Sequence, residues 1–511
     1  MSETEFPVQI PLAVSKTSSE SLQNQICIQL RERVADGRLK LGTRLTSIRE
    51  MAAQLDVSLN TVRLAYQQLI SEGYLETSEA KGTYVARALP EEGVYLPEAK
   101  EAEPNPDRHT ARFPPPFRDP GRIIARQRPQ NGAIDFWAGR TDPRSFPVRE
   151  WRHLTNVHLQ DSDANMTDYG DAAGLWELRE AIADHLARAR SFRPGPEQIV
   201  ITAGIQEALS IAARLFLKPG ATAVMEAPCY KGASYAFQSV GAELQRVAVD
   251  EEGVCVERIP AGLAALTYIT PSHQYPMGHI LSMSRRHALL EWAARSGAYI
   301  LEDDYDSDFR FQSSPLPALA SMDTSGCVIY LGTFSKVMGA GLRLGYMVLP
   351  PELVDMAASI KTLFSFSHPW LVQVVMADFI DSGDYAKRLR RMRQDRMQRR
   401  DSLHRALQHH FGDVTLRGLS GGMHVVWHLP QEMPSSLALQ QAAEPLGIYV
   451  YSPEASGADV SGCEALNERL LVFGYASLSN EEIWKGIRGL ASTTTRATSD
   501  DRPHQETVPR S

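Results

Sequence analysis

A proline-rich stretch near residue 100 divides this sequence into parts that cannot share one fold. Residues 89–120 read LPEEGVYLPEAKEAEPNPDRHTARFPPPFRDP. Proline fixes φ and has no backbone N–H to donate, so this stretch cannot form a regular helix or strand and predicts a semi-extended linker. We therefore expect an N-terminal arm at residues 1–20, a small domain at 21–88, a large domain at 121–490 and a polar, disordered tail at 491–511.

The composition is that of an ordinary globular protein. The chain has 511 residues, of which 43% are hydrophobic and 22% charged, enough for about three structural units. It has neither a secretory leader nor an apolar run of about 18 residues, so no membrane span is expected. Its five cysteines are scattered without a CxxC pair, which favours free thiols in the cytoplasm and no metal site. The net charge of −8 argues weakly against nucleic-acid binding, but a whole-chain sum can hide a local surface.

The small domain contains two short helical patterns joined by a tight turn. In SIREMAAQLDVSLNTVRLAYQQLISEGYL, apolar residues recur at helical spacing on both sides of Asp56-Val57-Ser58, and Ser58 is suited to cap the second helix. This pattern predicts a helix-turn-helix, whose second helix can enter the major groove of DNA. The segments at 74–77 and 83–85 flank a turn and predict the two strands of a wing. An ordinary helical hairpin without a DNA role would show a similar pattern.

The match extends over almost the whole domain. From QICIQLRERVADGRLKLG through SLNTV to KGTYV, the sequence resembles the winged helices of the GntR family. The resemblance implies binding to a double-stranded DNA operator. Members of that family usually carry an arginine directly after the serine that opens the recognition helix, whereas this chain has Leu59. Contacts with DNA are therefore expected from Thr46, Ser47, Arg49, Asn60, Thr61, Arg63 and Lys81. The domain is barely basic, which favours a dimer on paired half-sites.

The large domain alternates short apolar strands with amphipathic helices. IVIT, TAVMEA, ALTYIT, AYILEDD, CVIYLG and RLGYMVLP are the strand-like runs. This alternation predicts an α/β fold with a mostly parallel sheet.

One lysine of this domain lies in a setting that suits covalent chemistry. Lys336 follows a strand in YLGTFSKVMGAGLRLGY, and a lysine amine can form a Schiff base with an aldehyde. Thr333, Ser335 and Arg343 around it are donors suited to a phosphate. A lone lysine after a serine is also common on protein surfaces.

Three further segments give the lysine its context. In YILEDDYDSDF, Asp303 could keep a pyridine nitrogen protonated and Tyr305 could bond a phenolic ring oxygen, although a solvated acidic loop or a Mg²⁺ site would have the same composition. ITAGIQEAL places Gly204, Ile205 and Gln206 at a helix N-terminus that suits a phosphate. EAPCY puts Tyr230 where its ring could stack on a cofactor.

Together these segments resemble the fold-type I aminotransferases. With the winged helix in front, the chain is identified as similar to MocR/GabR-type transcriptional regulators from about residue 20 to residue 490, through YGDAAG, TAGIQEAL, PSHQYPMG, EDDYDSDF and GTFSK. The resemblance implies pyridoxal 5'-phosphate bound covalently to Lys336 and a small C-terminal α/β subdomain. It also implies a head-to-tail homodimer in which Tyr169 reaches the partner subunit's phosphate. The ring partners would be Asp303, Tyr305 and Tyr230, and the phosphate partners Gly204, Ile205, Gln206, Thr333, Ser335 and Arg343.

Two departures from the aminotransferase pattern concern ligand binding. Tyr275 stands where those enzymes have an asparagine at the ring oxygen, and Val472 stands at the position of the arginine that clamps the substrate carboxylate. Arg469 is near in sequence but should lie on the opposite face of its strand. Arg140, in FWAGRTDP, is an alternative clamp. We therefore expect Arg140 and Tyr275 to contact an effector.

A basic run, KRLRRMRQDRMQRRDSLHR, includes Arg388, Arg391 and Arg399 on one long helix. We interpret it as a solvated helix that packs on the small subdomain. A surface that touches DNA beside the operator is the other possibility.

These patterns favour a cytoplasmic regulator that senses a small amine, or pyridoxal phosphate itself, rather than catalysing a reaction. An active aminotransferase with a fused DNA-binding head is the alternative, and Val472 and Tyr275 argue against it. A DNA-binding protein that no longer holds the cofactor is disfavoured by the presence of Lys336, Asp303 and Arg343.

Overall fold

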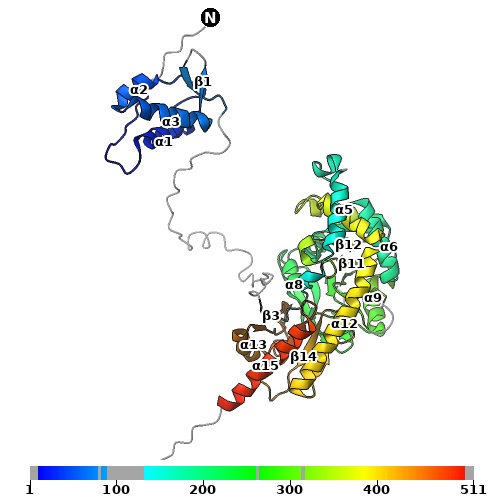
Figure 1. The fold of residues 1–511 in the computed structure, drawn as a ribbon. Coiled ribbons are helices and arrows are strands. Elements are labelled where there is room, and N and C mark those ends of the chain that lie inside the picture. Colours follow the sequence, from blue (N-terminus) through cyan, green and yellow to red (C-terminus); the bar gives the residue numbers. More distant parts are fainter. Residues whose placement is uncertain are drawn as a thin grey trace, which may run out of the picture. The chain divides into compact units, whose positions relative to one another are not determined.

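The chain forms two compact units, Met1–Phe113 and Pro114–Ser511 (Figure 1). The computed structural model describes residues 10–78, 82–88, 132–160, 162–260, 264–311 and 317–500, without the side chains of 163–164 and 495–500. The predicted linker, 89–120, lies outside this range. Within it, none of the helices combines the length and the apolar character that crossing a membrane requires.

The N-terminal unit is a winged helix, as predicted. Helices α1 (Leu22–Ala35), α2 (Ile48–Leu55) and α3 (Leu59–Ser71) precede the antiparallel hairpin of β1 (Leu75–Ser78) and β2 (Gly82–Val85). Ser47 and Ser58 cap α2 and α3 with their side chains, which satisfies backbone N–H groups that a helix start leaves free. Asp56 directly follows α2 and begins the turn, with a φ of 49° in the left-handed region.

The N-terminal arm is part of this core rather than a separate extension. Ile10 and Leu12 are buried in the same cluster as Met51, Val62 and Leu69. The side chains of the helices also bond to the arm's backbone, for example Gln54 to the Ile10 carbonyl oxygen at 2.8 Å. The folded unit therefore begins before residue 21, at least at Ile10.

The C-terminal unit is built on one large sheet. Within the described residues, eight strands lie in the order β4-β12-β11-β10-β9-β5-β7-β8. Strands β5, β7, β9, β10 and β11 pair in parallel, whereas β12 and β8 are antiparallel to their neighbours. The mostly parallel sheet is confirmed. The strands are β4 (Ile199–Thr202), β5 (Thr222–Ala227), β7 (Glu243–Asp250), β8 (Gly253–Val254), β9 (Ala264–Ile269), β10 (Tyr299–Asp303), β11 (Val328–Thr333) and β12 (Gly345–Val348).

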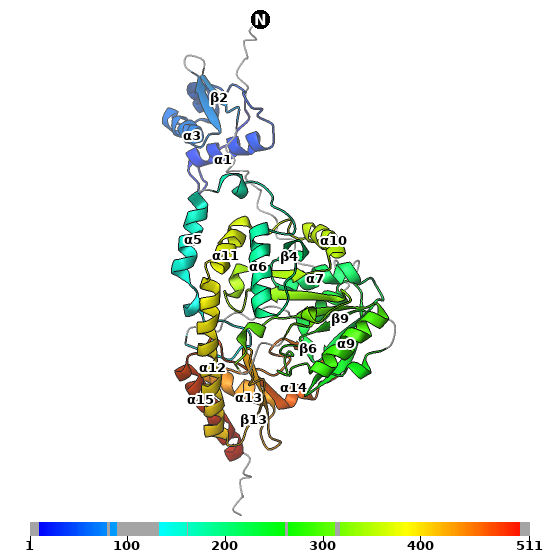
Figure 2. The same ribbon diagram turned by 90° about the vertical axis from the view of Figure 1, so that its right-hand side faces the viewer.

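Helices cover both faces of the sheet (Figure 2). Alternate residues of the strands divide between two sets of helices: Val200 and Leu301 face one set, and Ile201 and Ile300 face the other. The first set is α7 (Ile205–Phe216), α8 (Lys231–Gln238) and α10 (Pro351–Thr362). The second set is α6 (Trp176–Ala189), α9 (Met283–Ser296) and α11 (Trp370–Asp381), with α5 (Val148–Gln160) beside α11.

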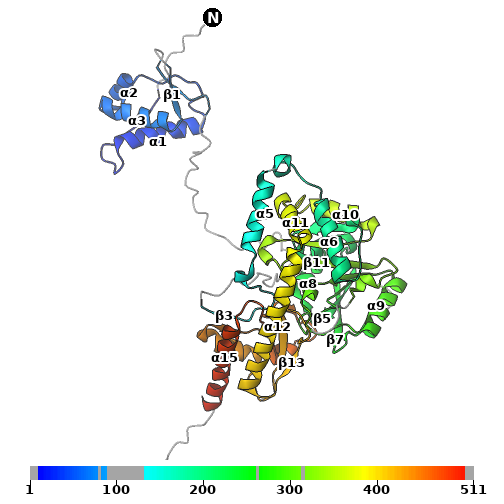
Figure 3. The ribbon, with the colours of Figure 1, turned by 45° about the vertical axis from the view of Figure 1, so that its right-hand side comes forward.

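A smaller subdomain follows along the long helix α12 (Asp384–Phe411), which lies beside α15 (Asn480–Asp500) (Figure 3). Its antiparallel sheet has the order β13 (Thr415–Arg417), β14 (His424–His428), β17 (Leu470–Gly474) and packs around Trp427, with α13 (Ser436–Ala443) and α14 (Leu466–Arg469). Two short pairs tie the subdomain to other segments: β15 (Ile448–Tyr449) with β3 (Ile134–Asp135), and β16 (Ala458–Asp459) with β6 (Cys229–Tyr230). Helix α15 continues past Leu490 to Asp500, so the predicted tail begins as helix.

Candidate functional site

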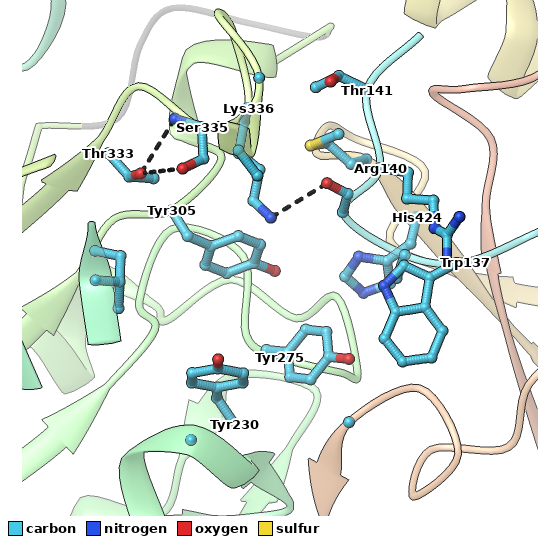
Figure 4. A pocket seen from close by; sticks show the side chains of 18 of the residues that line it. Trp137, Arg140, Thr141, Tyr230, Tyr275, Tyr305, Thr333, Ser335, Lys336 and His424 are labelled. Carbon is cyan, nitrogen blue, oxygen red and sulfur yellow. Dashed lines mark hydrogen bonds between the residues drawn. The ribbon is translucent and has the colours of Figure 1, made fainter. Parts of the chain in front are cut away.

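A cavity of about 1230 Å³ opens at one edge of the large sheet (Figure 4). Parallel strands bring their carboxyl ends to the same edge, and here the ends of β10 and β11 contribute Asp303 and Thr333 to its wall. The loop after β11 contributes the half-buried Lys336, whose Nζ lies 3.4 Å from the Gly139 carbonyl oxygen. The structure therefore joins segments that are far apart in the sequence around one lysine.

Gly139 allows this close approach. Its φ is 89°, and a Cβ on this residue would lie 2.7 Å from the Lys336 amine. Burial lowers the pKa of that amine below its ordinary value. The neutral form, which is the nucleophile toward an aldehyde, is thereby favoured.

One corner of the cavity suits a phosphate. Ile205 and Gln206 begin α7, and Gly204 precedes them with a φ of 95°. The guanidinium of Arg343 lies so close that a Cβ on Gly204 would be 3.4 Å from it. Thr333 and Ser335 add hydroxyl groups 3.0 Å apart. A helix N-terminus, a guanidinium and hydroxyls together form an anion site.

Asp303 is the candidate partner for the nitrogen of an aromatic ring bound in the cavity. Its Oδ2 accepts a hydrogen bond from Tyr268 at 2.7 Å, while its buried Oδ1 has no partner. Burial, the largest effect, raises the pKa of Asp303 to about 7. A carboxylate in this setting is stabilised by a pyridinium N–H, so the donor set fits pyridoxal phosphate.

Tyr230, Tyr275 and Tyr305 line the cavity beside the lysine (Figure 4). Tyr230 and Tyr275 lie edge to face with ring centroids 6.2 Å apart. The hydroxyl of Tyr305 donates to the His273 carbonyl oxygen at 2.9 Å, and that of Tyr275 to the Ser456 carbonyl oxygen at 2.6 Å. With their protons donated to these carbonyl oxygens, both hydroxyls can accept a hydrogen bond from a ligand but do not donate one.

The acidic residues that follow β10 do not converge on one point. Glu302 accepts from the backbone N–H groups of residues 319 and 320, and Asp304 pairs with Arg190 at 2.6 Å. Asp306 lies 2.9 Å from Nδ1 of His273. Because each carboxylate has a different partner, the alternative of a Mg²⁺ site formed by these acids is wrong.

His273, Asp306 and His424 form a separate buried cluster. Glycine backbone closes around it: a Cβ on Gly422 would lie 2.5 Å from the His273 Nδ1 and 2.7 Å from the Asp306 carboxylate. The cluster is therefore tightly packed and hydrogen-bonded, and the Nδ1 of His273 also lies 3.1 Å from the Tyr305 hydroxyl.

The residue at the position of the usual carboxylate-binding arginine is buried away from ligand. Val472 is fully buried in an apolar cluster with Ala138 and Val426. Arg469 donates to the carbonyl oxygens of Leu429 and Met433, away from the cavity. Arg140 does line the cavity, in an ion pair with Asp135 at 3.1 Å; Tyr451 also bonds to Asp135.

Tyr169 lies outside the cavity. Its side chain is 83% exposed and stacks on Phe366 at 5.0 Å. Phe364 and Leu363 are exposed beside it. Within one chain Tyr169 has no access to the phosphate corner, so a role at the cofactor requires a second subunit.

The basic run packs on the small subdomain, as expected, but its arginines are only partly solvated. Arg388 and Arg399 are half-buried on α12 and donate to backbone carbonyl oxygens of Val337 and Ala476. Arg391 alone of the three is exposed. A helical row of apolar residues, Leu389, Met392 and Leu403, marks the inner face of this helix and could have located the half-buried arginines.

The residues predicted to contact DNA are only partly available. Arg49, Asn60 and Arg63 are exposed, and the Arg63 guanidinium donates to Asn60 at 2.6 Å. Ser47 is exposed but caps α2, and Thr61 bonds to the capping Ser58. Thr46 is only 6% exposed, which corrects its assignment as a DNA contact. Lys81 lies outside the described residues.

Leu59 gives a testable property of this surface. Its side chain is 54% exposed at the start of α3. We expect Leu59→Arg to strengthen DNA binding and to steepen the dependence on salt by about one phosphate contact. Fluorescence anisotropy at several salt concentrations measures both. Leu446→Arg, which adds the same charge at an exposed site of the other unit, should change neither.

Several cavity residues were not predicted from the sequence. They are Trp137, Gly139, Tyr268, Arg388 and His424. Gly139 and Trp137 directly precede Arg140, so the FWAG segment was the available signal. Tyr268 and His424 lie inside ordinary apolar strands and give no signal of their own.

Comparisons with known proteins agree with both halves of this description. The family "Bacterial regulatory proteins, gntR family" matches residues 22–85, and "Aminotransferase class I and II" matches residues 139–483. The chain is 33% identical to a probable rhizopine catabolism regulatory protein, MocR, of Rhizobium meliloti, over 94% of this chain and 95% of the relative. It is 32% identical to the pyridoxine biosynthesis regulator PdxR of Corynebacterium glutamicum, over 82% and 85%.

Among solved structures, the α-aminoadipate aminotransferase LysN of Thermus thermophilus, solved with a phosphopyridoxyl-leucine, is 27% identical. Its TM-score is 0.64, and the match covers 72% of this chain and 94% of LysN.

Proposed function

Because the chain belongs to the MocR-type transcriptional regulators, in which a GntR winged helix precedes a pyridoxal phosphate-dependent aminotransferase-type domain, we propose that it controls transcription in response to a small amine or to the cofactor itself. The genes it controls would serve amino-compound catabolism or vitamin B6 supply, as the names of its relatives suggest. It would act in the cytoplasm on a double-stranded operator.

The observation that carries this proposal is the state of the cavity. The cofactor partners are present around Lys336, while the clamp position on β17 is buried and apolar. A site that holds the cofactor but lacks the usual arginine for a substrate carboxylate, with only Arg140 as an alternative, is suited to sensing rather than turnover. We assign the cofactor partners to Lys336, Asp303, Tyr305, Tyr230, Gly204, Ile205, Gln206, Thr333, Ser335 and Arg343.

When bound, pyridoxal phosphate supplies an aldehyde that captures amines and a ring that withdraws electrons. The chain's own residues hold it: Lys336 provides the amine for attachment, Asp303 holds the proton at the ring nitrogen and Arg343 neutralises the phosphate. Arg140 and Tyr275, at the other end of the cavity, would contact the effector.

A homodimer would complete the site. The exposed Tyr169–Phe366 stack lies outside its own cavity, and in a head-to-tail pair Tyr169 would contact the partner's phosphate. Two winged helices would then bind two half-sites, and a ligand that favours one arrangement of the dimer would change operator affinity.

The test uses the full-length protein. Bound duplexes are selected from a random pool, and the affinity for the selected duplex is measured with and without pyridoxal phosphate and with amines added. We expect one sequence with paired half-sites, and an affinity that changes several-fold with the ligand. Selection of no sequence, or an affinity that no ligand alters, contradicts the proposal. Rapid product formation from an amino donor and a keto acid would instead support the fused aminotransferase.

A further inference from the structure

The arginines of α12 hold the loops that surround the cofactor cavity. Their guanidinium groups donate to backbone carbonyl oxygens. In Figure 2 the helix runs from beside the large sheet into the small subdomain. The acceptors lie in five loops, at Ser145, Asp308, Lys336 and Val337, Leu419, and Ala476.

Arg396 is the member of this row that bonds to the lysine. It is 2% exposed, and its Nη2 donates to the carbonyl oxygen of Lys336 at 2.6 Å. Its guanidinium carbon lies 3.3 Å from the ring centroid of Phe309, and its buried Nη1 has no hydrogen-bond partner. In the described part of the chain no carboxylate forms an ion pair with Arg396. Arg396 is therefore a buried cation with no carboxylate of the described residues at ion-pair distance; burial lowers its own pKa to about 9, and the more distant Asp306 acts against this.

The charges around Lys336 come from three elements. Asp303 at the end of β10 and Asp306 after it favour the ammonium form of Lys336, whereas Arg396 on α12 opposes it. His424 on β14 is neutral, because burial lowers its pKa to about 3. Burial is the largest influence on the pKa of Lys336 and lowers it, and the charge of Arg396 acts in the same direction.

We propose that Arg396 is a positioning residue for Lys336: its hydrogen bond fixes the backbone that carries the lysine, and its buried charge adds to burial in disfavouring the ammonium form of Lys336, against Asp303 and Asp306. Two cations near each other in a medium of low dielectric constant repel strongly, so a fixed guanidinium disfavours a neighbouring ammonium. Only the neutral amine has the lone pair that attacks a carbonyl carbon. The inference rests on the proposed cofactor site and describes how its lysine is prepared.

The experiment reads the amine directly, on the full-length chain freed of cofactor. Acetic anhydride is added in limiting amount at a series of pH values, and acetylation of the Lys336 peptide is followed by mass spectrometry. The neutral amine attacks the anhydride, acetate leaves and a proton passes to water, so the rate follows the neutral fraction. We expect the wild-type profile to have its midpoint below 10.5, the ordinary value for lysine.

Substitutions of Arg396 distinguish the effect of its charge from the effect of its shape. Arg396→Gln should move the midpoint to higher pH and slow acetylation below it. Arg396→Lys, which keeps the charge, should leave the midpoint in place. Arg400→Gln is the matched control: Arg400 is also buried, donates to the Leu419 carbonyl oxygen and lies over Phe311, but it has Asp401 beside it and does not contact Lys336.

The proposal is overturned if Arg396→Gln and the wild type share one midpoint, if Arg400→Gln shifts it equally, or if the wild-type midpoint is 10.5 or higher. Should Arg396→Gln not fold, Arg396→Met fills the same space over Phe309 without charge and is subject to the same comparison. Loss of cofactor binding with these profiles unchanged would count against the proposed function alone, because acetylation is measured without cofactor.

Discussion

The variant Lys336→Ala is expected to lose pyridoxal phosphate completely on dialysis, while the wild-type chain retains about one molecule per subunit. The reason is that the other contacts are non-covalent: Arg343 and the start of α7 hold the phosphate, and Asp303 holds the ring nitrogen. Without the bond to Lys336 the cofactor exchanges with solvent. The visible absorbance of the dialysed protein measures retention, and borohydride reduction followed by mass spectrometry locates the attached residue.

Lys231 provides the control for this experiment. It also lines the cavity, with its amine 4.0 Å from the Glu454 carboxylate. Lys231→Ala should keep the cofactor, since an ion-paired lysine at the cavity wall is not placed for attachment. Retention of the absorbance by Lys336→Ala, or its loss from Lys231→Ala, would contradict the assignment of Lys336.

The fold was predictable because its elements follow local rules. The cap at Ser58 and the apolar positions of α3 define the recognition helix from sequence alone. The buried strands β10 and β11 appear as short apolar runs that end in polar residues. The arm was less predictable, because burial of Ile10 depends on contacts with helices distant in sequence.

The site was predictable where chemistry and position coincide, as at Lys336 and Asp303. It was not predictable where a charged or polar side chain is buried. Charge along α12 suggests a solvated face, but Arg396 is buried because carbonyl oxygens and the Phe309 ring replace its water. Thr46 is a second example: its position in the sequence suggested a contact with DNA, but its side chain is buried.

Adjacent carboxylates after β10 show why sequence alone could not separate function from stability. Asp303 lines the cavity, whereas Asp304 does not and forms a buried ion pair with Arg190. The side chains of Asp304 and Arg190 are 0% and 3% exposed. The two acids are adjacent in the sequence, and they reach different surroundings because successive residues of an extended chain point to opposite faces.

Asp304→Asn is therefore expected to reduce the free energy of unfolding by about 3–5 kcal/mol, because it leaves the Arg190 guanidinium buried without its counterion. Tyr330, which donates to the same Asp304 oxygen at 2.5 Å, would lose a charged acceptor as well. Urea titration followed by tryptophan fluorescence measures the change. A loss below about 1 kcal/mol, the range of exposed pairs, would show that this ion pair is not a main support of the sheet edge.

Asp303→Asn should behave in the opposite way. Burial raises the pKa of Asp303 from 3.8 to about 7, so the folded state disfavours the carboxylate that the unfolded chain carries freely. For this group, stability is greatest at low pH and falls as the pH rises from 3.8 to about 7. Asp303→Asn removes that loss, so the cofactor-free variant should be no less stable than the wild type at pH 7 while binding pyridoxal phosphate more weakly. If Asp303→Asn destabilises the chain as much as Asp304→Asn does, the carboxylate of Asp303 serves the fold and not the cofactor.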